Sequence, residues 1–414
     1  MLVLAGGDLV LPDRLLGSAS LIVDGTRIAA IAPGPRADPA GATVVDVRDC
    51  YVVPGFIDVH VHGVEGFDTL DEGDPVTEIA RRLPRYGVTA FCPTTTACPP
   101  GALRAALTEV ARARSARPAG SARVLPAHLE SNFINPEYRG AQPAACLRLP
   151  PAAGGPPAAG GLTLFSGAGV RPPVEEDFSA RDILDAIAAA RPDVGIVTLA
   201  PELPGGLDLV RTLTAAGHRV SLGHSGATVD QAADAIDAGA SHATHLFNRM
   251  TPMSPRAPGI AGAVLAREEV AAELICDGYH VHPAMSQMAI AAKGVGRMLA
   301  ITDGTAGSGL PIGSYARLGG QRILVTDRAA VLEEGTLAGS TLTMDRAFRT
   351  IVTVFGFSVV EAAVLCATTP ARELGLTGFG VLAEGAVADL VVLDRGFHVR
   401  RTFIDGQEIF PRPS

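Results

Sequence analysis

The stretch "DVGIVTLAPELPGGLDLVRTLTAAGHRVSLGHS", residues 193–225, contains one complete strand, helix and strand pattern. Its first part is a short apolar run rich in Val and Ile, as is typical of a buried strand. A Pro- and Gly-containing turn and a helical stretch follow, and then comes a second apolar run, "RVSL". Repeated strand, helix and strand units predict a parallel sheet.

The same alternation extends in both directions along the chain. Ala-rich helical stretches separate further strand-like runs, which are "GVTAFCPT" (87–94), "ARVLPAHLE" (122–130), "SHATHLF" (241–247), "AAELICDG" (271–278) and "RMLAITDG" (297–304). The pattern covers about 300 residues, and a (β/α)8 barrel usually has about 250, or more with insertions. A doubly wound sheet is the alternative, but no G-x-G-x-x-G follows the first strand. We predict a (β/α)8 TIM-like barrel over residues 54–373.

Both ends of the chain have a different sequence pattern from the predicted barrel. Near the N-terminus, "SLIVDG" and "RIAAIAPG" are brief apolar runs separated by turn signals, and "VADLVVLDRG", "HVRRTFIDG" and "QEIF" repeat this near the C-terminus. We predict that residues 1–53 and 374–414 pair into one small β-sandwich domain. Residues 143–173 are too rich in Pro and Gly for a regular helix and form either a flexible insertion or a lid, of which mobility is the preferred interpretation.

Composition excludes some partners. The 414 residues are 47% hydrophobic and carry a formal charge of -9, and Lys293 is the only lysine, which argues against nucleic acid. No uninterrupted apolar stretch reaches the roughly 20 residues of a membrane helix. The six cysteines have no framework spacing and the N-terminus has no secretory pattern, so we expect a cytoplasmic protein.

Polar residues follow or end several of the apolar runs. In a barrel these ends form the catalytic face. They are His60, His62, Glu130, His224, His245 and Asp303. His60 and His62 are two residues apart, so a strand points both side chains to the same side, which is a chelating geometry.

Each of these residues also has a simpler interpretation. A lone strand histidine is usually a hydrogen-bonded structural group, which is our expectation for His128, His218, His242 and His398. Asp303 or Glu130 alone could cap a helix. The convergence of imidazoles and carboxylates at several strand ends nevertheless favours a metal centre. Glu130, His224 and His245 form a set of two histidines and one carboxylate that leaves positions open for water.

The segments "VVPGFIDVHVHG", "HLE", "GHSGAT", "THLFN", "ITDG" and "EGAVADLVVLD" together resemble the amidohydrolase superfamily, and more narrowly the N-acetylglucosamine-6-phosphate deacetylase family. The resemblance implies a (β/α)8 barrel with a β-sandwich from both termini, usually as a homodimer. It implies that Glu130, His224 and His245 hold the primary divalent metal and that Asp303 is the catalytic acid and base.

The resemblance extends to further residues. His280, in "DGYHVH", matches a histidine that contacts the substrate carbonyl, and Arg256, in "SPRAPG", matches a phosphate-binding arginine that can reach across the dimer. Asn248 and Gln142 match substrate-contacting positions. His60 and His62 match a second metal position that only some members fill. Other amidohydrolases bridge two metals with a carboxylated lysine, but Lys293 is not at a strand end.

The resemblance implies a metal-dependent amide hydrolase that removes the acetyl group of N-acetylglucosamine 6-phosphate, with water activated by the metal and by Asp303. Imidazole and carboxylate ligands suit Zn²⁺ first, with Fe²⁺, Mn²⁺ or Co²⁺ as alternatives. The alternative enzyme is a deacetylase of another N-acetyl amino sugar. A catalytically silent sugar-binding barrel is the interpretation from another class, and retention of the ligand set together with Asp303 weighs against it.

The sequence departs from the family around the substrate. Ser131 and Asn132 replace Gly-Pro after the "HLE" glutamate, and "TDGTAGSG" replaces the usual Asp-Ala-Met. Arg249, in "FNRM", stands where a small alanine is usual. It could form a phosphate clamp with Arg256, fill the phosphate pocket and select another substrate, or turn to solvent.

Overall fold

The structure is a computed structural model that describes residues 1–34, 41–151 and 177–411. Its larger part is a barrel of eight parallel strands. In chain order they are β6 (Phe56–Val61), β9 (Val88–Thr95), β11 (Ala127–Glu130), β12 (Val194–Leu199), β13 (Arg219–Leu222), β14 (His242–Ala243), β15 (Ala271–Ile275) and β16 (Met298–Ile301). A parallel bridge between Val61 and Gly304 closes the barrel, and the N–H of His62 donates to the carbonyl of Gly304 at 2.8 Å. The predicted (β/α)8 architecture is confirmed.

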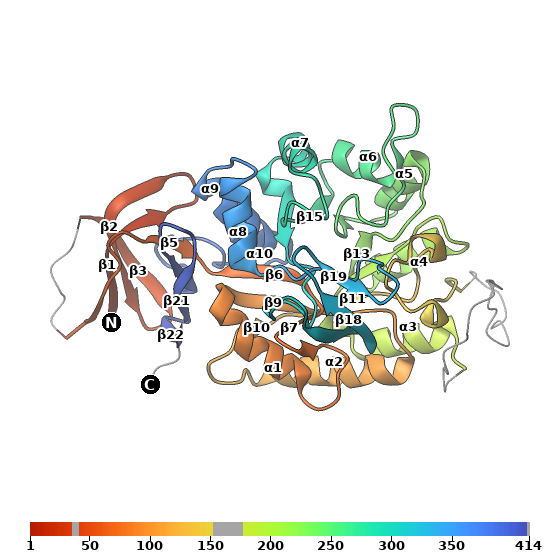
Figure 1. The fold of residues 1–414 in the computed structure, drawn as a ribbon, viewed down its shortest axis with the longest axis horizontal. Helices are drawn as coiled ribbons and strands as arrows, with labels where there is room; N and C mark the ends of the chain where they lie inside the picture. The colour runs from red at the N-terminus through yellow and green to blue at the C-terminus, as the bar shows by residue number, and fades with distance from the viewer. Residues whose placement is uncertain (35–40, 152–176, 412–414) are drawn as a thin grey trace.

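A helix follows every barrel strand, and the helices surround the strands (Figure 1). They are α1 (Pro75–Arg82), α2 (Pro100–Ser115), α3 (Ala180–Ala189), α4 (Gly206–Ala215), α5 (Val229–Asp237), α6 (Gly259–Ala266), α7 (Pro283–Lys293) and α8 (Met344–Thr353). Local sequence fixes several starts, since Ser179 with Asp182, and Thr228 with Gln231, form capping boxes that satisfy free N–H groups. Two short helices, α9 (Val359–Ala363) and α10 (Thr369–Glu373), complete the barrel part.

The core lies between the strands and the helices. Strands such as β9 are buried along their whole length, as expected when helices cover a parallel sheet, so they have no alternating pattern. Phe56 of β6 stacks on Phe348 of α8 with ring centroids 5.4 Å apart, and neither side chain is exposed. This contact joins the first strand of the barrel to its last helix.

Both chain ends meet in a second sheet at one end of the molecule (Figure 1). Its strands are β1 (Leu2–Val10), β2 (Leu15–Asp24), β3 (Arg27–Pro33), β4 (Thr43–Asp46), β5 (Tyr51–Pro54), β20 (Leu390–Leu393), β21 (Val399–Ile404) and β22 (Gln407–Phe410). Side chains from both chain ends, including Leu21 and Phe403, share one core, and Arg27 bridges to Val387. The sheet therefore folds over its own core, as in the predicted sandwich.

The chain passes directly from this sheet into the barrel at Gly55. A Cβ at Gly55 would lie 2.3 Å from the Oγ1 of Thr89, so a side chain here would collide with β9. The close approach explains the glycine between β5 and β6. The domain limits that we expect, 1–53 with 374–414 and 54–373, stay a prediction.

An antiparallel insertion between β16 and α8 was not predicted. It comprises β17 (Tyr315–Leu318), β18 (Gln321–Val325) and β19 (Ala330–Leu332). Gly319 and Gly320 join the first two strands with φ angles of 55° and 82°. A two-residue Gly-Gly connection is a hairpin signal that the sequence contained. A pair of two-residue strands, β7 (Gly63–Val64) and β8 (Phe67–Asp68), follows β6.

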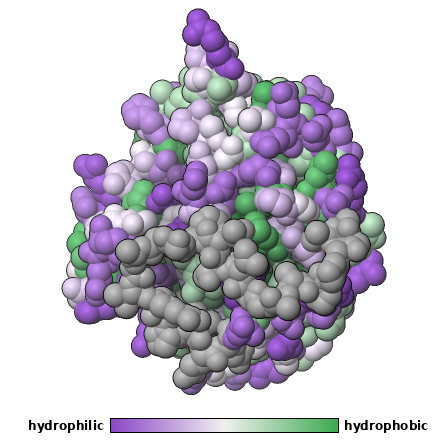
Figure 2. Space-filling model, turned by 90° about the vertical axis from the view of Figure 1, so that its right-hand side faces the viewer, coloured by the Kyte–Doolittle hydropathy of each residue, from purple (hydrophilic) through white to green (hydrophobic). Residues whose placement is uncertain are grey.

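The face turned away from the terminal sheet is mostly hydrophilic, with scattered apolar side chains (Figure 2). Among the residues that the structure describes, no helix combines the length and the apolar character that crossing a membrane requires. The Pro- and Gly-rich segment 143–173 is described only as far as residue 151, so the choice between insertion and lid lies outside the described residues.

Candidate metal centre and active site

The candidate residues meet at the carboxyl end of the barrel. Glu130 is the last residue of β11, and His224, His245 and Asp303 each lie two residues beyond the end of a strand. The φ angles of His224, His245 and Asp303 are 48°, 30° and 49°, in the left-handed region. Such a conformation costs a non-glycine residue about 1–3 kcal/mol and persists where the surrounding structure holds it, often at functional sites. These three backbone positions are therefore consistent with a functional site.

Glu130, His224 and His245 form a compact, buried group that could hold a metal ion. The Oε1 atom of Glu130 lies 3.1 Å from the Nε2 atom of His224 and 2.9 Å from the Nε2 atom of His245. The two Nε2 atoms are 3.0 Å apart. In a tetrahedral zinc site with Zn–N distances of about 2.1 Å, ligand atoms lie about 3.4 Å from one another. The distances between these three atoms are thus close to those expected when all three bind one metal ion.

The protonation of His224 agrees with this role. Its Nδ1 lies 2.8 Å from the carbonyl oxygen of Tyr138, to which only an N–H can donate. With one proton, on Nδ1, the ring of His224 presents the lone pair of Nε2 to Glu130 and His245. Lone pairs and a carboxylate oxygen that converge at this distance repel unless a cation lies among them, so this donor set fits a divalent metal.

His60, His62 and Asp303 form a second group beside the first. The Nε2 atoms of the two histidines are 3.2 Å apart, and they lie 3.4 Å and 3.3 Å from the Oδ1 atom of Asp303. The Nε2 atom of His62 is also 3.5 Å from Glu130. Glu130 thus lies between the two groups, as a ligand shared by two ions would.

The electrostatics of the centre require positive charge. Burial acts to lower the pKa of His60 and of His62, yet the surrounding carboxylates raise these pKa values to about 9 and about 10. Burial acts to raise the pKa of Glu130, yet the contacts with His224 and His245 hold that pKa well below its usual range. The pKa of Asp303 is likewise lowered against the effect of burial, chiefly by His60 and His62. Bound protons or metal ions can supply this charge.

His280 and Gln142 line the same cavity. The Nδ1 of His280 lies 2.6 Å from the Oδ2 of Asp277, which orients the ring, while its buried Nε2 forms no well-aligned hydrogen bond with the residues that the structure describes. Burial would lower the pKa of His280, but Asp277 raises it. Gln142 accepts a hydrogen bond from the N–H of Ala97 and donates to the Oε2 of Glu130, so it orients that carboxylate.

Two of the three remaining predicted substrate residues reach the cavity. Asn248 and Arg249 line it, and the side chain of Arg249 lies beside Gly140, where a Cβ would come within 2.7 Å of its Nε. Arg249 is exposed, with a φ angle of 52°. Arg256 is also exposed but does not line this cavity.

The departures from the family pattern have local partners. The Ser131 hydroxyl donates to the carbonyl of Thr198 at 2.6 Å, and the Asn132 amide donates to the carbonyls of Cys98 and Cys146 at 2.8 and 2.7 Å. In "TDGTAGSG", the hydroxyl of Thr305 donates to the carbonyl of Ser340. These side chains anchor the loops around the centre.

The histidines that we expected to be structural have ordinary partners. The Nδ1 of His218 lies 3.0 Å from the carbonyl oxygen of Val194, and exposed His398 lies beside Asp394. His128 and His242 lie inside the barrel and are engaged by hydrogen bonds. Lys293 ends α7 and donates to the carbonyl of Val264, so it takes no part in the centre.

Sequence reasoning missed Glu273, a fully buried carboxylate on β15 that contacts His60. A signal was present, since a charged residue within the apolar run "AAELICDG" is buried only when it is paired. Sequence reasoning also missed the apolar residues Leu318 and Leu337, which line the cavity from the β17–β19 insertion and the loop after it.

The comparisons agree with this geometry. The "Amidohydrolase family" model matches residues 209–409. The chain is 36% identical to an N-acetylgalactosamine-6-phosphate deacetylase of Escherichia coli O157:H7, with 93% of both chains covered. It is 31% identical to an N-acetylglucosamine-6-phosphate deacetylase of Bacillus subtilis, with 97% of this chain and 95% of the relative covered.

A solved structure is similar over nearly the whole chain. It is a mutant N-acetyl-D-glucosamine-6-phosphate deacetylase of Mycobacterium smegmatis in complex with N-acetyl-D-glucosamine-6-phosphate. The TM-score is 0.84 at 31% identity, and the match covers 99% of both chains. The chain therefore belongs to the N-acetylglucosamine-6-phosphate deacetylase family of the amidohydrolases, which are metal-dependent hydrolases of carbon–nitrogen bonds.

Proposed function

We propose that this protein hydrolyses the N-acetyl group of N-acetylglucosamine 6-phosphate to release acetate and glucosamine 6-phosphate. The observation that carries the proposal is the convergence of Glu130, His224 and His245 with Asp303 at one cavity. Metal-assisted hydrolysis of an amide uses Lewis acidity and a proton carrier at the same carbon, and these residues can provide for both. Relatives that are named for this reaction support the choice of substrate.

In this proposal Glu130, His224 and His245 hold a divalent metal ion, and His60 and His62 provide the position for a second one. The bound metal supplies Lewis acidity to the attacking water and to the acyl group. Zn²⁺ suits the donor set first, with Fe²⁺, Mn²⁺ or Co²⁺ as alternatives. Gln142 holds the carboxylate of Glu130 in its orientation by donating to Oε2.

Asp303 moves the proton. Its Oδ1 atom faces the shared space beside His60 and His62, where it accepts a proton from the attacking water. It then returns this proton to the amine nitrogen, because an amide nitrogen leaves poorly without one. His280 acts here in its protonated form, which Asp277 favours, and its Nε2–H donates to the oxygen of the acyl group as negative charge develops there.

The residues that line the cavity support the choice of a phosphorylated sugar as substrate. In this proposal Asn248 and Arg249, which line the cavity, bind the sugar phosphate, since a guanidinium can hold a phosphate through two parallel hydrogen bonds. The second candidate substrate is N-acetylgalactosamine 6-phosphate, which the E. coli relative at 36% identity favours. The two sugars differ only in the configuration of one hydroxyl.

A panel of three substrates tests the proposal. Acetate release is measured with N-acetylglucosamine 6-phosphate, N-acetylgalactosamine 6-phosphate and unphosphorylated N-acetylglucosamine, and metal content is determined on the same sample. We expect the highest kcat/KM with the first substrate, and activity that a chelator abolishes and added metal restores. Release from none of the three by metal-loaded protein would contradict the proposal.

We predict that Arg249→Ala raises KM for the phosphorylated sugar by about 10–100-fold with little change in kcat, because a charged hydrogen bond contributes about 1.5–3 kcal/mol. Arg211→Ala, which removes an exposed arginine of α4 that pairs with Asp208, is the control and should leave KM unchanged. An unchanged KM for Arg249→Ala would place this side chain in solvent. Improved activity would mean that it blocks the phosphate pocket.

We also propose that the protein is a cytoplasmic homodimer. All six cysteines are free thiols, in keeping with a reducing compartment. Arg256 lies exposed on the loop that follows the cavity residues and is available to the site of a second subunit. Light scattering of the purified protein tests the dimer, and a monomeric mass would contradict it.

A further inference from the structure

The interior of the barrel beneath the metal centre is polar. Barrels of this kind usually fill their interior with branched apolar side chains. Here hydrogen bonds join strands that are not neighbours, such as β6 and β15, so they cross the interior. The buried side chains involved are His60, His128, Thr198, Ser221, His242, Thr244 and Glu273.

Glu273 is the centre of this network. Its Oε2 atom lies 2.9 Å from the Nδ1 of His60 and accepts from the backbone N–H of His245 at 3.2 Å. Its Oε1 atom lies 3.0 Å from the Nε2 of His242. An ionised carboxylate can only accept, so each of these nitrogens carries its proton toward Glu273.

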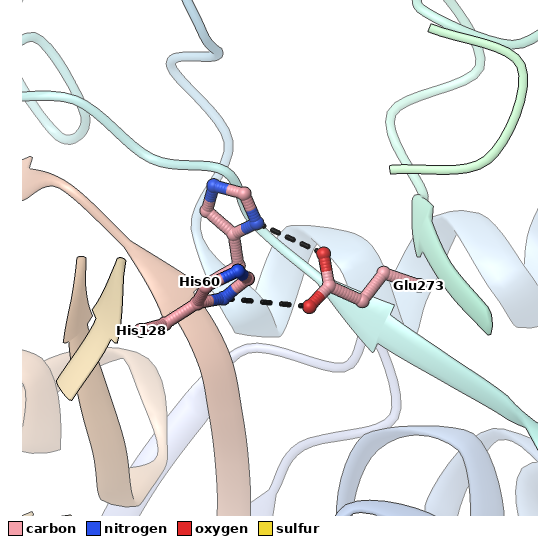
Figure 3. A group of neighbouring side chains, drawn as sticks. All are labelled: His60, His128 and Glu273. Atoms are coloured by element: carbon pink, nitrogen blue, oxygen red, sulfur yellow. Dashed lines mark hydrogen bonds and ion pairs between the residues drawn. The ribbon is translucent and has the colours of Figure 1, made fainter. Parts of the chain in front are cut away.

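His128 extends the network from Glu273 to the hydroxyl groups of Thr198, Thr244 and Ser221. Its Nδ1 faces the carbonyl of Val59 at 3.0 Å and lies 3.5 Å from the Oε1 of Glu273 (Figure 3). This nitrogen is therefore the donor, and Nε2 accepts from the hydroxyl of Thr198 at 2.8 Å. Thr198 in turn accepts from Thr244, and Thr244 accepts from Ser221. Each of these hydrogen bonds can therefore be assigned one donor and one acceptor without conflict.

His60, His128 and Glu273 also lie close enough to one another to hold a metal ion (Figure 3). The hydrogen-bond directions argue against that use. The Nδ1 atoms of both histidines, which face Glu273, are occupied by protons and cannot coordinate. When the Nε2 atom of His60 carries no proton, its lone pair therefore points to the opposite side, toward His62 and Asp303.

Resting on the proposed function, we propose that Glu273 is a positioning residue for both metal positions. One oxygen holds the ring of His60 at the second position and the backbone of His245 at the first. Because the carboxylate accepts the Nδ1 proton, it selects the form of His60 that can bind a cation and makes Nε2 a stronger donor. The two positions are thus supported by a single buried charge.

The test is the affinity of the full-length protein for Zn²⁺, measured by competition with a chelating dye. Glu273→Gln keeps the shape but removes the charge, and Glu273→Leu removes every acceptor. We expect Zn²⁺ binding to weaken by about 10-fold for the first and about 100-fold for the second, the range for residues that orient metal ligands. Ser221→Ala removes one hydrogen bond of the same network without touching Glu273, and its Zn²⁺ affinity should equal that of the wild type.

Thermal unfolding of the metal-free variants separates positioning from stability. If Glu273→Leu does not fold, Glu273→Gln decides the question alone. Wild-type Zn²⁺ affinity in folded Glu273→Gln would overturn the inference, as would an equal loss in Ser221→Ala. A wild-type protein that binds Zn²⁺ but releases no acetate would overturn the proposed function and leave this inference standing.

Discussion

Asp303→Asn is expected to retain its metal and to lose nearly all turnover. The amide keeps the size of the carboxylate but cannot take a proton from water or return one to the amine, and loss of such a group lowers kcat by about 10²–10⁴-fold. Glu130, His224 and His245 remain to hold the metal. Steady-state acetate release and metal analysis of the same sample measure both effects.

The control for this variant is Asp389→Asn. Asp389 is a buried carboxylate that contacts Arg123 and accepts from the N–H of Asp405, outside the catalytic cavity. The control should retain its kcat, which separates proton transfer from the general cost of removing a buried charge. A metal-loaded Asp303→Asn enzyme with wild-type kcat would remove Asp303 from the mechanism.

His224→Asn is expected to lose its metal together with its activity. The substitution removes one of the two imidazoles of the group formed by Glu130, His224 and His245, so we expect metal binding to weaken by at least about 100-fold, beyond the loss typical of residues that only orient a ligand. Metal per chain after dialysis is the measurement, and an excess of Zn²⁺ should restore part of the activity.

His218→Asn serves as the matched control, because His218 precedes β13 in sequence and its side chain, in the part of the chain that the structure describes, hydrogen-bonds only to the carbonyl of Val194. The control should keep a wild-type metal content. Full metal occupancy in His224→Asn at low Zn²⁺ would show that His224 is not a ligand.

The sequence predicted the barrel and its catalytic end because both depend on local patterns. The apolar runs and the polar residues that follow them, such as His224 after "RVSL" and Asp303 after "MLAI", are visible along the chain. Parallel strands bring those ends together, so the grouping of Glu130, His224 and His245 followed from topology. The structure brings these three side chains into one group that could hold a metal ion.

The partners of these residues could not be predicted in the same way. Glu273 contacts His60, which lies 213 positions away, and only the closed barrel brings the two together. The side chain of Arg249 depends on a left-handed backbone that propensity does not predict for arginine. The β17–β19 insertion was not predicted although Gly319-Gly320 is a hairpin signal, because its strands have only 4, 5 and 3 residues, too few to show a clear alternation.

The central claim is that Glu130, His224 and His245 share one divalent metal ion. Anomalous X-ray diffraction from crystals of zinc-loaded protein, collected at the zinc absorption edge, tests it most directly. The account predicts an anomalous peak about 2.0–2.2 Å from the Nε2 atoms of both histidines and from a carboxylate oxygen of Glu130. Ordered side chains with no anomalous peak among them, in crystals that contain zinc elsewhere, would contradict it.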